Sequence, residues 1–263
     1  MNDMLDDDLD KKLESRIDRK LISKSKRGIF TDGFKKNQVI NEVLDKTTMM
    51  IMYGMINSHI ISYVNGVVKA GKESVLFWAV DENKNDVALK VYLISTTSFK
   101  KREQYILGDP RFSKIKHGTR NLVYLWAKKE YSNLKRCSKC GISAVKPIHL
   151  SKNVLAMEFV GKNGIPANTL LETEVNKKDY VNAISLLSNL YRNAHLVHGD
   201  FSEYNIFKTE KGLIVFDLGS AVDIQHPNSM EFLKRDISNI TKFFVKRGLT
   251  VKNPLDVYDE VVK

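Results

Sequence analysis

Three oxygen-bearing side chains in one stretch of the chain have types and spacing suited to phosphoryl transfer. Asp200 ends the tripeptide H-G-D, Asn205 follows shortly after it, and Asp217 opens the tripeptide D-L-G. Transfer of phosphate from ATP needs hard oxygen ligands for Mg²⁺ and a separate carboxylate that serves the attacking group. The three residues supply both, in the order of a phosphotransferase catalytic loop followed by a metal-binding aspartate. Either tripeptide alone is common as a turn, but their joint spacing favours catalysis.

Regular elements are expected on both sides of this loop. Apolar residues recur at helical spacing before it and predict a supporting helix; they are Val181, Ile184, Leu187, Leu190 and Ala194. After the loop, residues 213–216 form an apolar run bounded by glycines, which is typical of a buried strand. This strand would deliver Asp217 at its end, so that two carboxylates from different elements converge on one phosphate. His198 is expected to brace the loop.

A glycine-containing turn and a strand with one lysine form the predicted phosphate-binding part. Residues 61–80 read as strand, turn and strand, and the turn consists of Lys69, Ala70, Gly71, Lys72, Glu73 and Ser74. Backbone N–H groups in such a turn can cover the phosphates of ATP. In the following run, V-A-L-K-V-Y-L, alternation places Lys90 on one face with Ala88 and Tyr92. A lysine in that position contacts the phosphates and forms an ion pair with a glutamate from a helix.

The glutamate partner of Lys90 is expected from a helix over residues 122–134. Glu130 is the predicted partner, and Glu103 is the alternative. The neighbouring Lys128 and Lys129 have the wrong charge for this role.

A strand over residues 154–161 is predicted to run into a linker that meets adenine. Backbone groups of Glu158 and Val160 lie at the expected positions, with Met157 behind the base.

The chain after Asp217 is short. Asn228 to Glu231 has the pattern of a capping box and predicts a helix through Phe244, with Gly248 as its stop. Asn253-Pro254 predicts a last short helix. The A-P-E signature of ordinary protein kinases does not occur, and little chain is left for a peptide-binding lobe. An extended peptide substrate is therefore not expected.

Composition and charge bound the possible partners. The 263 residues include 42 Lys and Arg against 31 Asp and Glu, a formal net charge of +11, and suit one two-lobed domain with an extension. The charge favours an anionic partner but does not distinguish RNA from a nucleotide or an acidic protein, and a solvated basic surface is equally consistent. Residues 1–45 form a charged N-terminal extension, expected to be partly helical, whose basic cluster either contacts RNA or is solvated.

No segment has the pattern of a signal peptide or a membrane span. The N-terminus, M-N-D-M-L-D-D-D, is acidic, and the apolar residues 47–64 are interrupted by Asn57, Ser58 and His59. A soluble intracellular protein is expected. Cys137 and Cys140 form a lone C-x-x-C that cannot supply four zinc ligands, so two free thiols are predicted.

Four motifs together resemble one protein family. H-G-D-F-S-E-Y-N, the G-K-E-S turn, Y-I-L-G-D-P-R-F at residues 105–112, and W-A-K-K-E-Y-S-N-L resemble the RIO atypical serine/threonine protein kinases, in particular their first, Rio1-type subfamily. The resemblance covers residue 46 to the end. The Y-I-x-G-D-P-R-F segment discriminates strongly, because general kinase chemistry does not explain it.

The resemblance implies an α+β, trimmed two-lobe protein-kinase-like fold. The N-lobe, with an antiparallel sheet and helices, is expected over about 46–157, the hinge over 158–161, and a reduced, mainly helical C-lobe over 162–263. It also implies binding of ATP and Mg²⁺, with Mn²⁺ as an alternative metal, together with serine/threonine autophosphorylation, ATPase activity and a role in maturation of the small ribosomal subunit. The expected partners are ATP and the small-subunit precursor with its rRNA and proteins, in the cytoplasm; no membrane or DNA partner is expected.

Carried over by position, the resemblance assigns roles to individual residues. Lys90 would bind phosphates, Glu158 and Val160 adenine, Asp200 would accept a proton, and Asn205 and Asp217 would hold the metal. Asp217 also matches a phosphoaspartate site of the family.

Two departures from the family pattern stand out. Lys69-Ala70 replace two hydroxyl residues of the phosphate loop, and the charge of Lys69 is expected to compensate for them. Ser220 replaces a common glutamine after the metal aspartate. Two other functions stay open, a small-molecule phosphotransferase of the aminoglycoside-kinase type and a catalytically weak RNA-binding scaffold.

Overall fold

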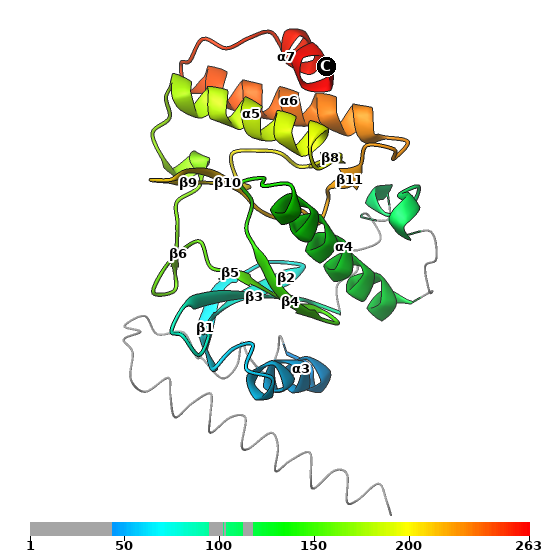
Figure 1. Cartoon of the computed structure of the whole chain (residues 1–263), viewed down its shortest axis with the longest axis vertical. Coiled ribbons are helices and arrows are strands. Elements are labelled where there is room, and N and C mark those ends of the chain that lie inside the picture. The colour runs from blue at the N-terminus through cyan, green and yellow to red at the C-terminus, as the bar shows by residue number, and fades with distance from the viewer. Residues whose placement is uncertain (1–43, 95–101, 103, 113–117) are drawn as a thin grey trace, which may run out of the picture.

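The computed structural model describes residues 44–94, 102, 104–112 and 118–263, and Figure 1 shows their arrangement. A twisted sheet with a helix beneath it forms one end of the molecule, and packed helices form the other (Figure 1). This is the predicted α+β, two-lobe architecture. Most of the N-terminal extension, residues 1–43, and the alternative glutamate Glu103 lie outside the described residues.

The sheet at the N-terminal end is antiparallel and has five strands in the order β1-β2-β3-β5-β4. Its strands are β1 (Tyr63–Ala70), β2 (Ser74–Val80), β3 (Asp86–Tyr92), β4 (Pro147–Ser151) and β5 (Val154–Glu158). The register pairs Leu76 with Lys90 and Lys90 with Leu155, so the lysine strand lies in the middle of the sheet. A central strand is held on both edges, which fixes the direction of its side chains.

The two faces of this sheet pack against different helices. Val87, Leu89 and Val91 of β3 join the core formed with helix α3 (Lys46–Asn57). The alternate side chains Lys90 and Tyr92 point to the other face, toward helix α4 (Thr119–Lys139). The predicted alternation along this strand is thus confirmed.

The C-terminal part consists of helices over small two-stranded sheets. Helices α5 (Lys177–Arg192), α6 (Ser229–Lys246) and α7 (Pro254–Val262) pack together, with the pairs β9 (Ile206–Thr209) with β10 (Gly212–Val215) and β8 (Leu196–Val197) with β11 (Val222–Asp223) below them (Figure 1). The remaining short elements are η2 (Pro110–Phe112), β6 (Gly161–Lys162), β7 (Ile165–Pro166) and η3 (Leu170–Glu172). None of the helices in the described part of the chain has the length and apolar character of a membrane span.

Two local predictions are wrong in detail. Asn228 does not cap α6 through its side chain, because its backbone (φ −97°, ψ 11°) lies outside the extended region that a capping residue adopts. Val181 is 55% exposed, since α5 turns this position away from the core that buries Ile184, Leu187 and Leu190. The helix predicted over 122–134 is longer at both ends, and α6 runs to Lys246 instead of Phe244. The predicted start of the last helix is confirmed, because Asn253 caps α7 by accepting a hydrogen bond from the Leu255 N–H.

Candidate active site

A cavity of about 340 Å³ opens where β3, α4 and the segment after β10 meet. It is lined by residues 71–74 of the turn between β1 and β2, and by Lys90, Tyr92, Arg102, Trp126 and Asp217. Gly71 closes the turn by donating its N–H to the Ser74 carbonyl, 2.9 Å away. The lining includes the cations Lys72, Lys90 and Arg102, which suits a polyphosphate.

Lys90 is held between two carboxylates. Its Nζ lies 3.0 and 2.8 Å from the two oxygens of Glu130 and 2.9 Å from Oδ1 of Asp217. Tyr92 donates its hydroxyl to Glu130 as well. The structure therefore places Glu130 against Lys90, as the helix pattern predicted.

The opposite charges of Lys90 and its two carboxylate partners shift the pKa values of Lys90 and Asp217. Burial alone would lower the pKa of Lys90, but Asp217 and Glu130 raise it above its ordinary value. Burial alone would likewise raise the pKa of Asp217, yet Lys90 lowers it to about 2. The side chain of Asp217 is 40% exposed, because it faces the cavity. Its carboxylate is therefore ionised and lines the cavity.

Asn205 joins the catalytic loop to the strand that carries Asp217. Its Nδ2 donates to the backbone oxygen of Asp200 at 2.9 Å and to the Asp200 carboxylate at 3.1 Å. The backbone carbonyl of Asn205 accepts the Phe216 N–H at 3.0 Å. Burial raises the pKa of Asp200, and the nearby charge of Asp217 adds to this, although His198 and Asn205 oppose it. Asp200 is thus the more basic of the two aspartates.

This set of groups fits Mg²⁺ by its donor chemistry. The amide nitrogen of Asn205 is engaged with Asp200, which leaves its Oδ1 as an acceptor. The backbone oxygen of Asn205 is bonded to the residue before the ionised Asp217. A carboxylate and an amide oxygen are hard ligands, and Mg²⁺ commonly takes only a few protein ligands with substrate phosphates and waters. Among the described residues, no three His, Cys, Asp or Glu side chains form a metal cluster.

The catalytic loop is braced from two sides. His198 Nε2 lies 3.1 Å from the carbonyl of Phe216, the residue before Asp217, as the sequence indicated. Asp236 of α6 accepts the N–H groups of Gly199 at 2.8 Å and Phe201 at 3.0 Å. Asp236 was missed by sequence reasoning, although an aspartate on the apolar face of a predicted helix was the available signal.

Arg102 is a second residue that the sequence did not single out. It forms an ion pair with Glu73 of the phosphate loop and lies 4.8 Å above the ring of Trp126. Arg102 belongs to the basic run K-K-R, in which sequence alone does not tell which cation faces the site. Lys69 and Ala70, by contrast, are exposed at the end of β1 and do not line the cavity, so the structure gives no support to a compensating role for Lys69.

The predicted adenine contacts lie on β5 and just after it, outside the lining of the cavity. Met157 of β5 pairs with Ala88 of β3 in the sheet. The N–H of Glu158 donates to the Lys146 carbonyl at 2.8 Å, which leaves the Glu158 carbonyl as its group for a base. The Val160 carbonyl accepts the Ala167 N–H at 2.8 Å, which leaves the Val160 N–H for that role.

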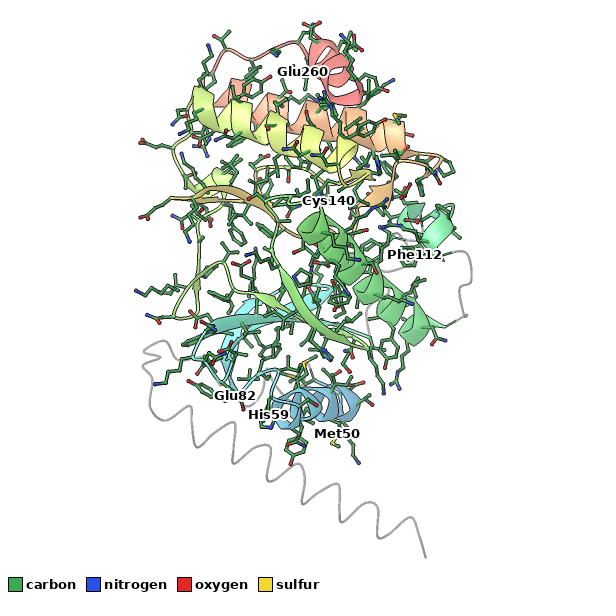
Figure 2. The ribbon with its side chains drawn as sticks, viewed as in Figure 1. Met50, His59, Glu82, Phe112, Cys140 and Glu260 are labelled. Carbon is green, nitrogen blue, oxygen red and sulfur yellow. The ribbon has the colours of Figure 1, made fainter. Side chains whose placement is uncertain are left out.

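The two cysteines lie away from this site. Cys140 marks the end of α4 nearest the helical lobe (Figure 2), and both thiols are free. Cys137 is buried, and burial raises its pKa to about 12. The prediction of two free thiols is confirmed.

Comparison with known proteins identifies the family. The model of the RIO domain matches residues 75–256. The RIO-type serine/threonine-protein kinase Rio1 of Haloferax volcanii is 37% identical over 248 residues, which cover 94% of this chain and 84% of that protein. The human serine/threonine-protein kinase RIO1 is 33% identical over 228 residues, covering 84% of this chain and 40% of that protein.

Length and fold comparisons complete this picture. The chain spans less than half of the human and Dictyostelium discoideum Rio1 relatives, covering 40% and 44% of them. The crystal structure of the Rio2 kinase-ADP/Mg²⁺-phosphoaspartate complex from Chaetomium thermophilum superposes with a TM-score of 0.60 at 21% identity, covering 81% of this chain and 64% of that one. That likeness concerns the fold. Together with the sequence matches, it shows that the chain belongs to the RIO family of serine/threonine-protein kinases, in its Rio1-type branch.

Proposed function

We propose that the chain is a Mg-ATP-dependent serine/threonine protein kinase and ATPase that autophosphorylates. The observation that carries the proposal is the group Lys90, Glu130 and Asp217, which meets in a cavity lined by the turn of residues 71–74. In this arrangement Lys90 neutralises phosphate charge, and Glu130 fixes the direction of Lys90. Glu158 and Val160 would contact adenine through their backbone, with Met157 behind it.

Magnesium, when bound, would be held by Asn205 and Asp217 and would neutralise the charge of the phosphates. Mn²⁺ is the proposed alternative metal. Asp200 lies beside Asn205 and has the higher pKa of the two aspartates, so it is placed to accept a proton from an attacking hydroxyl.

The phosphoryl group is proposed to pass through Asp217. A carboxylate oxygen of Asp217 attacks the γ-phosphorus, the bond to the β–γ bridging oxygen breaks, and ADP leaves with that electron pair. In the second step a water or a serine hydroxyl attacks the phosphorus, its proton goes to Asp200, and the Asp217 carboxylate leaves. The same site thereby acts as an ATPase or as an autophosphorylating kinase.

The proposed setting is maturation of the small ribosomal subunit in the cytoplasm, with precursor rRNA and proteins as partners. The family and the net charge of +11 support it. A small-molecule phosphotransferase is less consistent, because α6 and α7 bury Phe244, Val257 and Val261 in the core.

The decisive experiment uses γ-labelled ATP and compares wild type with two variants. Wild-type label should be released by hydroxylamine, because an acyl phosphate is labile. Asp217→Asn should abolish this labile label, whereas Asp200→Ala should slow turnover and let the label persist. The exposed Asp259→Asn on α7 is the matched control and should behave as wild type. If all wild-type label resists hydroxylamine and maps to serine or threonine, Asp217 keeps only its metal-binding role.

A further inference from the structure

A buried polar cluster lies beneath the segment that follows Asp217. The cluster consists of Asp109, Arg111, Lys129 and Asn133, from the Y-I-L-G-D-P-R-F and W-A-K-K-E-Y-S-N-L motifs. Asp109, Lys129 and Asn133 are each at most 1% exposed. Figure 2 shows Phe112, the neighbour of Arg111, near α4. None of the four residues has a part in the proposed transfer chemistry.

Lys129 and Asn133 hold the backbone of residues 218–221. The Lys129 ammonium donates to the carbonyl of Gly219 at 2.9 Å and also to that of Ala221. The Asn133 amide donates to the carbonyls of Leu218 and Ala221, each at 2.8 Å. Three carbonyls in the four residues after Asp217 therefore accept hydrogen bonds from one helix.

The orientation of Asn133 is itself fixed. Arg111 donates through Nη1 to the Asn133 Oδ1 at 2.7 Å, so the amide nitrogen must face the backbone carbonyls. Arg111 is in turn held by both oxygens of Asp109, at 2.9 and 2.7 Å. A chain of hydrogen bonds thus runs from Asp109 to the segment after Asp217, and the bonds made by Arg111 are charge-assisted.

An ordinary packing role does not account for Lys129. Burying an ammonium group is unfavourable, and here burial, with the charge of Arg111, lowers its pKa to about 7 while Asp109 and Glu130 oppose the shift. Its ammonium group donates to two neutral carbonyls. An apolar side chain of similar volume would often fill such a site at least as stably.

The cluster acts on a part of the backbone that is conformationally special. Asp217 has φ +57°, an uncommon conformation for a residue with a side chain, and it persists where the surroundings hold it. Gly219 packs against Trp126, whose Nε1 would lie 2.7 Å from any added Cβ. The same helix carries Glu130, so α4 holds Lys90 with one side chain and the Asp217 segment with its neighbours.

We propose that Lys129 and Asn133 are positioning residues, which hold residues 218–221 so that the Asp217 carboxylate faces magnesium and the γ-phosphate. Asp109 and Arg111 orient Asn133 for this task. The inference rests on the proposed function, since it assigns to α4 the support of the proposed metal ligand. Groups that orient a metal ligand from behind can alter metal affinity strongly without touching the metal.

The test compares Lys129→Met with Lys128→Met, an exposed lysine next to it on the same helix. Three quantities are measured on the full chain: the Mg²⁺ concentration for half-maximal ATP turnover, the affinity for ADP in the presence of EDTA, and the thermal midpoint. In Lys129→Met the required Mg²⁺ concentration should rise about tenfold. Its affinity for metal-free ADP should stay within about twofold of wild type, because Lys90 and the phosphate loop are intact, and Lys128→Met should match wild type throughout.

A purely structural role predicts a different result. A folded Lys129→Met with a lower thermal midpoint and a wild-type Mg²⁺ requirement overturns the proposal. If Lys129→Met does not fold, Asn133→Ala decides, because it removes the donor to Leu218 and keeps Lys129; it should raise the Mg²⁺ requirement, and an unchanged requirement refutes the inference. A failure of the proposed function appears separately, as wild-type protein without magnesium-dependent ATP turnover.

Discussion

At the scale of single residues, the site is governed by where positive charge is held. The ammonium group of Lys90 forms ion pairs with the carboxylates of Glu130 and Asp217, and Lys90 lines the cavity. Its strand is fixed by Leu89 and Val91 on the opposite face, which do not depend on the charge. Removal of the charge should therefore affect chemistry far more than folding.

Lys90→Ala should lower ATP turnover by orders of magnitude while the fold is retained. The loss follows from misaligned phosphates and from two carboxylates left without their shared cation. Steady-state ATPase assays and circular dichroism measure both properties, with the exposed Lys211→Ala as the control. Unchanged turnover in folded Lys90→Ala would remove Lys90 from the site.

Asp236 makes stability depend on pH. Burial raises its pKa to about 6, although His198 and the N–H groups of Phe201 and Gly199 oppose the shift. A carboxyl group with a raised folded-state pKa binds its proton more tightly in the native state. Its contribution to stability is therefore fully present below its ordinary pKa of 3.8 and is lost as pH rises through about 6.

Denaturation of wild type and Asp236→Asn at several pH values isolates this effect, because the variant cannot titrate there. The wild-type minus variant difference in free energy of unfolding should fall between about pH 4 and pH 7, by at most about 3 kcal/mol. A difference that stays constant with pH would show that Asp236 has an ordinary pKa.

At the scale of elements, the helices that support the catalytic loop differ in how they begin. Asn176 caps α5 by accepting the N–H groups of Lys178 and Asp179, and Asp179 accepts the Asn176 N–H in return. This is a complete capping box, which sequence reasoning did not note. Asn228, where a box was predicted, makes no side-chain cap to α6.

The two asparagines form a matched pair of substitutions. Asn176→Ala should lower stability by about 1 kcal/mol, because two N–H groups of α5 lose their acceptor. Asn228→Ala should leave stability nearly unchanged. Thermal unfolding should show a midpoint about 2–4 °C lower for the first variant alone. Equal shifts in the two variants would contradict this account of the caps.

At the scale of the whole molecule, the net charge of +11 bears on association with an anionic partner. A protein that neutralises RNA phosphates releases counterions, so its affinity depends steeply on salt. The proposed ATP site is a cavity that offers a few direct contacts, so affinity for ATP should respond less. The two ligands can thus be compared on the same preparation.

Affinity for small-subunit precursor particles should fall by about tenfold or more between 50 and 200 mM salt if rRNA contacts dominate. Sedimentation or filter binding across a salt series measures this, with ATP affinity as the internal reference. Particle binding that is insensitive to salt would indicate protein contacts instead.

Sequence by itself predicted the candidate site residues and the elements that carry them. Asp200, Asn205 and Asp217 follow from motif order, and Lys90 and Glu130 follow from the period of a strand and of a helix. These features are local, because spacing along the chain decides which side chains share a face. The wrong details, at Val181 and Asn228, are also local, where exposure and backbone angles depend on the neighbouring elements.

Only the tertiary structure decided which distant groups meet. The bond between Lys129 and Gly219 joins residues 90 positions apart, and the bond between Asp236 and Gly199 joins residues 37 positions apart. The pair of Arg102 and Glu73 likewise links a loop to the phosphate turn. Periodicity along the chain shows that a position faces the core, but it does not show which backbone carbonyl will accept a hydrogen bond from that side chain. The hydrogen-bond partner depends on how distant elements pack against one another, because a buried polar group is stable only where a partner lies within hydrogen-bond distance.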